Sequence, residues 1–236
     1  MISAIVISFY DHDYIKECIA SISFVDEIII VGKIDEVVLS EIQQKYPAKF
    51  IESRSVDFDF LLKQASSEAS HDWIVGLEAN HCVSKQLSEE ISAAAVKTGF
   101  RGKYKVKTRF NFMGKLMKFS GYRTSYTSFL FHKDSIGTKA TTKKLKNRIE
   151  ELYLDFDRYN ERLTKKAKLK AQYLYGYKKR PNFLHFSWNP IWTLKKIFFF
   201  QLGLLDGKEG FIFAYLNAFK EFKTYLFLWL MYRNIE

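Results

Sequence analysis

The chain has 236 residues, of which 47% are hydrophobic and 27% are charged, and its formal net charge is +11. This length and this hydrophobic content fit one large α/β domain with an appendage or two small domains, and they exclude a disordered chain. The charge is uneven, because residues 1–100 carry a net −8, residues 101–180 a net +17 and the remaining residues a net +2. We therefore expect an acidic domain joined to a strongly basic segment that faces an anionic partner.

The cysteines and the apolar stretches indicate a cytoplasmic protein. Cys18 and Cys82 stand alone, without metal-ligand spacing or a disulfide framework. The N-terminal run from Met1 to Ser8 carries neither basic residues nor a cleavage site, so it predicts a buried strand and not a signal peptide. The most apolar C-terminal stretches are shorter than the roughly 20 residues of a membrane span; they are 197–205, 211–219 and 225–232.

Strands and helices alternate through the first hundred residues. Apolar β-branched runs predict the strands, and apolar residues at helical spacing predict the helices. This alternation predicts βαβ crossovers and a mostly parallel sheet that binds ligands beyond the carboxyl ends of its strands. The expected strands are 2–8, 27–31, 49–52 and 73–77, and the expected helices are 14–23, 36–46, 60–69 and 84–96.

The pattern changes after Gly99. Alternating basic and apolar residues predict a strand over 103–110, a hairpin near Met113–Lys115 and a returning strand over 127–132. Residues 143–177 are charged and helical in period. We therefore expect an α/β domain over residues 1–142 and a basic, aromatic-rich helical extension over residues 143–236.

Several motifs resemble those of family 2 glycosyltransferases of the GT-A fold, in particular the subgroup with lipopolysaccharide-core glucosyltransferases. The likeness spans nearly the whole chain. It includes the segment around Glu78–Asn80, the run from Arg109 to Lys115 that leads to Ser120–Tyr122, and the run from Gly203 to Phe211. The resemblance implies a GT-A-like α/β domain with a C-terminal helical extension at a membrane surface.

The activity that this resemblance implies is transfer of a sugar, with inversion, from a nucleotide-diphosphate donor to a membrane-associated glycan or lipid-linked acceptor. The implied setting is synthesis of envelope polysaccharide or lipopolysaccharide, on the inner face of the cytoplasmic membrane and without nucleic acid. A diphosphate leaving group requires Mg²⁺ or Mn²⁺ held by carboxylates, or basic side chains that neutralise it directly. The candidate donor-site residues are Asp11, Asp35, Glu78, Asn80 and Arg109, and the candidate metal ligands are Glu78, Asn80 and His81.

The chain departs from the family pattern at these positions. The metal-binding Asp-x-Asp is represented by Glu78-Ala79-Asn80, which keeps one carboxylate and weakens metal binding. The acidic residue after the second strand corresponds to Gly32, which leaves Asp35 as a substitute. The expected catalytic base falls on Ser125, so no base is assigned. A histidine of the family corresponds to Glu150.

Each feature also has a structural interpretation. Glu78 suits the start of a helix, Asp13 suits a helix cap and His81 suits an ordinary surface loop. The aromatic C-terminal helices are either a helix–helix core or a pair that dips into lipid headgroups; in the second case the basic residues meeting lipid are Lys195, Lys196, Lys220 and Lys223. Two functional hypotheses follow: an active transferase, or a catalytically inactive relative that acts as a binding or scaffolding partner at the membrane.

Overall fold

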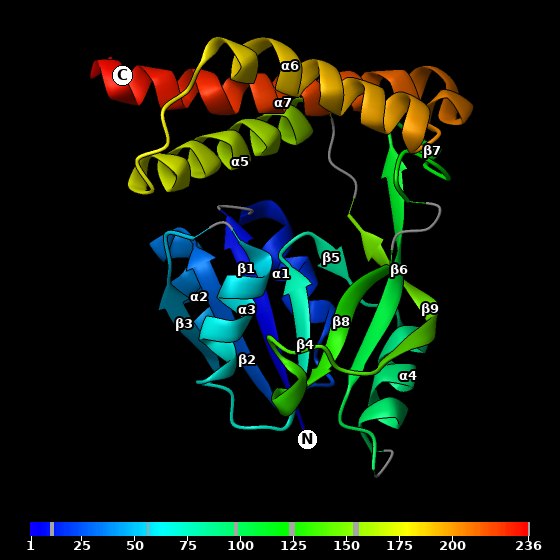
Figure 1. The fold of residues 1–236 in the computed structure, drawn as a ribbon. Coiled ribbons are helices and arrows are strands. Elements are labelled where there is room, and N and C mark those ends of the chain that lie inside the picture. The colour runs from blue at the N-terminus through cyan, green and yellow to red at the C-terminus, as the bar shows by residue number, and fades with distance from the viewer. Residues whose placement is uncertain (10–11, 56, 97–98, 123–125, 153–155, 236) are drawn as a thin grey trace. The chain divides into compact units, whose positions relative to one another are not determined.

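The computed structural model describes residues 1–9, 12–55, 57–96, 99–122, 126–152 and 156–235. The predicted fold class is confirmed: strands and helices alternate in the N-terminal half around a sheet with a parallel centre, and the C-terminal part is helical (Figure 1). The chain divides into two compact units. Unit 1 comprises residues 1–109 and 126–152, and unit 2 comprises residues 110–125 and 153–236.

The centre of unit 1 is a parallel sheet in the order β3-β2-β1-β4. β1 (Ile2–Phe9) pairs with β2 (Glu27–Lys33) on one side and with β4 (Trp73–Glu78) on the other, and β2 pairs with β3 (Ala48–Glu52). All eight residues of β1 are buried. A strand that is covered on both faces has a continuous run of apolar residues in the sequence, so these strands could be predicted.

Helices cover both faces of this sheet. α1 (His12–Ser21), α2 (Glu36–Lys45) and α4 (Lys85–Val96) contribute side chains to one shared core cluster. α3 (Phe58–Ser66) lies on the opposite face, where a Cβ at Gly76 of β4 would meet the Leu62 side chain. The predicted helices of the first hundred residues are therefore confirmed, with ends shifted by a few residues.

Antiparallel strands extend the sheet beyond β4. β8 (Tyr126–His132) pairs with β4 and with β6 (Lys103–Phe112), and β9 (Thr142–Glu151) follows β6 in the sheet. β5 (His81–Cys82) pairs with β9, and β7 (Lys115–Leu116) forms a hairpin with the end of β6. A short 3₁₀ turn, η1 (Lys133–Ser135), follows β8. The hairpin and both strands expected in this region are confirmed.

The helical interpretation of residues 143–151 is wrong, because this segment is strand β9. Its buried apolar residues, Leu145 and Ile149, are four positions apart. That spacing puts two side chains on one face of a helix and equally on one face of a strand. Glu90 of α4 accepts hydrogen bonds from the backbone N–H groups of Lys146 and Asn147 at 2.7 and 2.9 Å. Strand β9 belongs to unit 1, which extends to residue 152.

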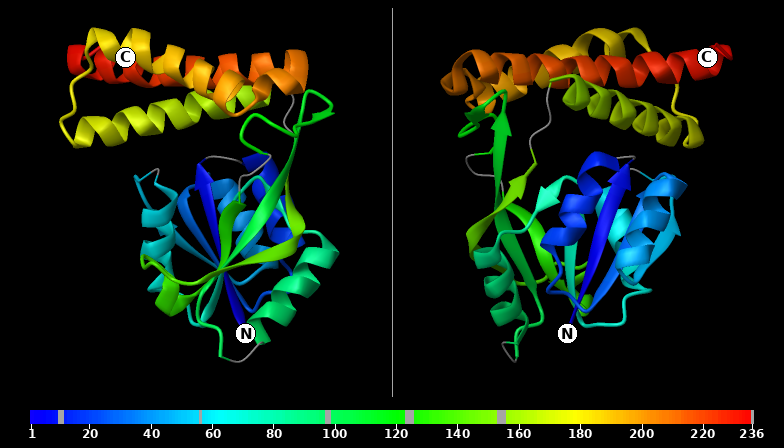
Figure 2. Two further views of the ribbon diagram at one scale, coloured as in Figure 1. Left: turned by 45° about the vertical axis from the view of Figure 1, so that its right-hand side comes forward. Right: turned by 180° about the vertical axis from the view of Figure 1, so that it is seen from behind.

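Unit 2 consists mainly of helices. α7 (Gly207–Arg233) runs alongside α5 (Phe156–Gly176) and α6 (Phe183–Lys195), as the views of Figure 2 show. A π-helical turn, η2 (Lys196–Phe200), and a 3₁₀ turn, η3 (Gly203–Asp206), connect α6 to α7. No helix among the described residues combines the length and the apolar character that a membrane crossing requires.

The lysines of α7 differ from expectation. Lys223 donates hydrogen bonds to Thr164 and Asn160 of α5, at 2.8 and 3.3 Å, and Lys220 lies 3.7 Å from the Glu221 carboxylate. Lys195 and Lys196, at the end of α6, are exposed. Two of the four lysines expected to face lipid are thus engaged within the helical unit.

A buried carboxylate joins the hairpin segment to the start of α7. Asp206 is 2% exposed, and it accepts hydrogen bonds from the backbone N–H groups of Lys118 and Phe119 and from the Ser120 hydroxyl, the last at 2.7 Å. Lys115 donates to the Asp206 carbonyl oxygen and to the Glu209 carboxylate. These contacts link the segments 115–121 and 203–211, whose residues carry part of the resemblance.

Candidate functional site

The candidate site lies where the strand order of the parallel sheet reverses. The chain passes from β1 to β2 and β3 on one side, and then returns to place β4 on the other side of β1. In open α/β sheets, ligands bind beyond the carboxyl ends of the strands at such a switch point. Ile7 of β1 is in register with Glu78 of β4, and the Ala79 N–H donates to the Ile7 carbonyl oxygen at 2.9 Å. Glu78 therefore stands at the switch point.

The turn after β4 has one buried side and one partly exposed side. Ala79 and Asn80 are completely buried, whereas Glu78 and His81 are partly exposed. The Glu78 N–H donates to Nδ1 of His81 at 3.2 Å, so in this arrangement the neutral imidazole carries its proton on Nε2. The Glu78 carbonyl oxygen accepts a weak hydrogen bond from the Cys18 thiol at 3.8 Å. These contacts of the Glu78 backbone fix the turn, and the Glu78 residue itself is partly exposed.

Asn80 is held from the other side by strand β9. Its Nδ2 donates to the Glu151 carboxylate at 3.1 Å, and its carbonyl oxygen accepts from the Leu152 N–H at 2.8 Å. In the β5–β9 pairing, His81 is opposite Glu151 and Cys82 is opposite Glu150. Glu151 was not among the predicted site residues. No local signal in the sequence marks it, because it reaches the turn through a pairing of strands about seventy residues apart.

Arg109 joins the same region through adjacent strands. It belongs to β6 and forms an ion pair with Glu150 of β9, with 3.5 Å between the guanidinium and the carboxylate. Both side chains are about half exposed. Strand order β6-β9-β5 therefore places Arg109, Glu150 and the Glu78–Cys82 turn in one part of the sheet.

The neighbouring ends of β1 and β2 explain the missing acidic residue at Gly32. Gly32 has a φ of +117°, and a Cβ at this position would lie 2.3 Å from the Ser8 carbonyl oxygen. An aspartate cannot take this backbone conformation without displacing β1. Among the described residues, the buried Ser8 hydroxyl has no hydrogen-bond partner. The close approach of the two strands thus excludes any side chain at residue 32.

The other predicted residues lie elsewhere or outside the described part. Asp35 is exposed, and its carboxylate accepts the Val37 N–H at 2.9 Å as the N-terminal cap of α2. Asp11 and Ser125 lie outside the described residues. The structure thus places Glu78, Asn80 and His81 in one turn, pairs Arg109 with Glu150 of β9, and gives Asp35 a capping role.

The described residues do not form a metal cage. Within the described ranges, no three His, Cys, Asp or Glu side chains gather as metal ligands. Asn80 is buried against Glu151, and Nδ1 of His81 accepts a backbone N–H, so two of the three expected ligands already bind protein atoms. Nor does Cys18 offer a reactive thiolate, because burial, together with the Cys82 thiol, raises its pKa far above the ordinary value.

Comparisons with known proteins concern the fold. No family model matches the chain. Solved structures with partial similarity include S. aureus TarS 1–349 in complex with UDP-GlcNAc, which is 11% identical with 100% of this chain and 93% of that chain covered and a TM-score of 0.47.

Two others are the Pyrobaculum calidifontis mannosyltransferase PcManGT in complex with GDP-Man and Mn²⁺, and a 4-diphosphocytidyl-2C-methyl-D-erythritol synthase from Anaerococcus prevotii. The mannosyltransferase is 10% identical, with 96% of this chain and 86% of that chain covered and a TM-score of 0.49. The synthase is 13% identical, with 65% and 90% covered and a TM-score of 0.43. At these values the similarity assigns no activity to the chain.

Proposed function

We propose that this protein is an inverting glycosyltransferase that uses a nucleotide-diphosphate sugar as donor. The observation that carries the proposal is the Glu78 carboxylate at the switch point between β1 and β4, on a turn held by both strands and by β9. The motifs shared with family 2 glycosyltransferases support the same reaction. In this proposal Asp11 contributes to the nucleoside side of the site.

The chemistry assigned to each end of the donor follows from charge. Glu78 accepts hydrogen bonds from hydroxyl groups of the sugar or the ribose, because a carboxylate is an acceptor. Arg109 neutralises the diphosphate, because a guanidinium forms strong paired hydrogen bonds with phosphate oxygens. To do so it exchanges its exposed pair with Glu150, which costs little because such pairs contribute only about 0–1 kcal/mol. Neutralisation by a guanidinium requires no metal ion.

We further propose that the acceptor is a membrane-associated glycan or a lipid-linked sugar. The net charge of +17 over residues 101–180 suits an anionic acceptor or an anionic surface. Exposed aromatic side chains on α6 suit the headgroup region of a bilayer. The expected location is thus the inner face of the cytoplasmic membrane, with synthesis of envelope polysaccharide or lipopolysaccharide as the setting.

A second candidate function is that of a catalytically inactive binding or scaffolding partner. The observation in its favour is that Asn80, at the second position of the expected Asp-x-Asp, is completely buried against Glu151. A residue so placed fixes the turn and does not reach a ligand. This candidate predicts a folded protein that binds no sugar nucleotide.

Calorimetric titration with UDP-glucose and GDP-mannose, with Mn²⁺ and with EDTA, separates the two functions. We expect one sugar nucleotide to bind with EDTA present, and Glu78→Gln to weaken it about tenfold, the loss of one charge-assisted hydrogen bond. Glu89→Gln, an exposed change on α4, serves as the control. Failure of both nucleotides to bind under either condition favours the inactive partner.

A second pair of variants tests the diphosphate assignment. Arg109→Gln should weaken UDP and UDP-glucose equally, because both carry the diphosphate. Arg101→Gln is the matched control, since Arg101 forms a similar exposed pair with Asp134 at 3.4 Å. Equal losses in the two variants would reflect overall charge and would contradict a specific role for Arg109.

A further inference from the structure

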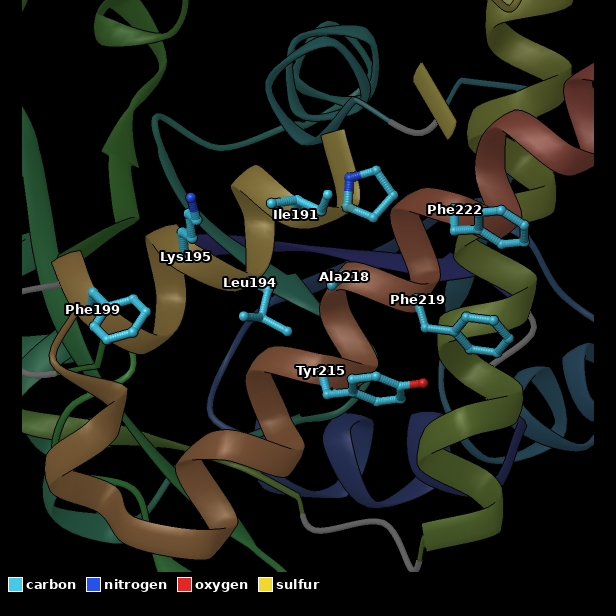
Figure 3. Close-up of a pocket in the computed structure, with 9 residues that line it drawn as sticks. Ile191, Leu194, Lys195, Phe199, Tyr215, Ala218, Phe219 and Phe222 are labelled. Atoms are coloured by element: carbon cyan, nitrogen blue, oxygen red, sulfur yellow. The ribbon is translucent and has the colours of Figure 1, made fainter. Parts of the chain in front are cut away.

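A cavity of about 440 Å³ opens between α6 and α7 in unit 2. Figure 3 shows Leu194 of α6 between the two helices, near the turn of α7 that carries Tyr215 and Ala218, while the Lys195 amino group points away from it. The volume falls in the range of small-molecule sites, about 300–1,000 Å³. The lining residues are Pro190, Ile191, Leu194, Lys195, Phe199, Tyr215, Ala218, Phe219 and Phe222.

The polarity of this lining selects a class of ligand. Lys195 is the charged residue among the nine that line the cavity, and the Tyr215 hydroxyl is a further polar group. The remaining lining side chains are apolar, and no carboxylate is among them. A hydrocarbon chain satisfies such walls, and an anionic group at its end satisfies the ammonium group of Lys195.

The surroundings of the cavity are unusually apolar for an exposed surface. None of the thirteen residues of α6 is buried. Phe199 and Tyr215 are 55% and 54% exposed although they line the cavity, and Trp188 and Trp192 of α6 are exposed as well. Contiguous exposed apolar side chains mark a surface that binds something apolar. Aromatic side chains with a lysine beside them are typical of surfaces that meet the lipid headgroup region.

We propose that this cavity binds the hydrocarbon chain of an anionic lipid, with Lys195 at the lipid's phosphate. The inference rests on the proposed function only where it identifies this lipid with the carrier of the acceptor sugar. Lys223, which stacks on the lining residue Phe219 at 4.7 Å, is held by Thr164 and Asn160, so it orders the cavity wall. Among the lining residues, Lys195 carries the positive charge; its exposed amino group lies at the rim and points outward, so it can meet a phosphate outside the cavity while the hydrocarbon chain lies inside.

Dodecyl phosphate below its micellar concentration is a suitable probe, titrated by calorimetry into the full chain. Dodecyl maltoside supplies a similar chain without the anionic group, and inorganic phosphate supplies the anion without the chain. We expect saturable binding of dodecyl phosphate at one site per chain, with much weaker binding of both comparison compounds.

Paired variants connect that binding to the cavity. Lys195→Gln should weaken dodecyl phosphate about fivefold, the contribution of one lysine near a phosphate surface. Lys196→Gln should change the affinity for dodecyl phosphate by less than about twofold, because Lys196 is also exposed but does not line the cavity. Ala218→Leu fills the space from its floor and should reduce binding of the chain. If that variant fails to fold, the two lysine variants still decide the question.

Three outcomes would overturn the proposal. Equal binding of dodecyl maltoside would show adsorption of any detergent. Equal effects of the two lysine changes would show a general charge effect. A dimer in sedimentation experiments that Ala218→Leu abolishes would show that a second copy occupies the groove. Titration with UDP-glucose is separate, so failure of the lipid site leaves the donor site intact, and the converse also holds.

Discussion

Glu27 provides the sharpest test of how unit 1 is held together. Its carboxylate accepts hydrogen bonds from the Ser3 hydroxyl, the Lys49 ammonium group, and the backbone N–H and hydroxyl of Ser70. These groups come from β1, β3 and the loop before β4, so one side chain at the start of β2 ties together four parts of the chain. We therefore predict that Glu27→Gln destabilises the protein and changes how its stability depends on pH.

The magnitude follows from the pKa of Glu27. Burial alone would raise this pKa, but the hydrogen bonds from Lys49, Ser3 and Ser70 lower it from 4.5 to about 2. At about 1.4 kcal/mol for each tenfold change in proton affinity, the ionised carboxylate contributes up to about 3 kcal/mol. The folded pKa is lower than the unfolded one, so this contribution is fully present above about pH 5 and disappears as the pH falls toward 2.

Urea unfolding followed by circular dichroism at pH 7, 4 and 2.5 measures the effect, and hydrogen exchange of amides in β1–β3 assigns it to this sheet. Glu27→Gln should lose about 2 kcal/mol at pH 7, and the difference from the natural protein should shrink toward pH 2. Glu89→Gln, an exposed change on α4, controls for the loss of one charge. A difference between natural protein and Glu27→Gln that is independent of pH would refute the reasoning.

Two further predictions concern Gly32, near the end of β2, and the buried Asp206 carboxylate in unit 2. Gly32→Ala should lower the free energy of unfolding by at least about 2 kcal/mol, because its Cβ would lie 2.3 Å from a carbonyl oxygen. Gly114→Ala, also at positive φ but with open space around it, should lower it by about 1 kcal/mol. Similar losses for the two variants in urea unfolding would contradict this. Asp206→Ala should lower the free energy of unfolding by about 2–4 kcal/mol, because the partly buried N–H groups of Lys118 and Phe119 and the buried Ser120 hydroxyl lose their acceptor. Asp157→Ala, an exposed change in α5, should be nearly neutral in the same measurement.

The fold was predictable where the sequence pattern has only one structural solution. Eight consecutive buried residues in β1 leave no alternative to a strand covered on both faces. The segment 142–151 was not predictable in this way, because Leu145 and Ile149 share a face in either a helix or a strand. The strand is stabilised by its pairing with β5 and by the Glu90 carboxylate, which accepts a hydrogen bond from its backbone. Both partners lie more than fifty positions away in the sequence.

The candidate site was predictable in part for the same reason. Glu78 follows an apolar strand, so its place at the carboxyl end of β4 could be read directly. The sequence does not show that Asn80 turns inward to Glu151, since that depends on the long-range pairing of β5 with β9. Gly32 stands where the resemblance implies an acidic residue, and in this structure a Cβ there would lie 2.3 Å from the Ser8 carbonyl oxygen.

The Asp206 carboxylate also constrains the order in which the chain becomes structured during synthesis. Its partner Ser120 precedes it by 86 residues. At about 5–20 residues per second, a ribosome needs roughly 4 to 17 s to add that length. Unit 1 is complete once residue 152 has emerged, while the stretch 115–120 waits for its acceptor. During that interval the stretch 115–120 lacks the carboxylate that accepts its N–H and hydroxyl groups in the complete chain.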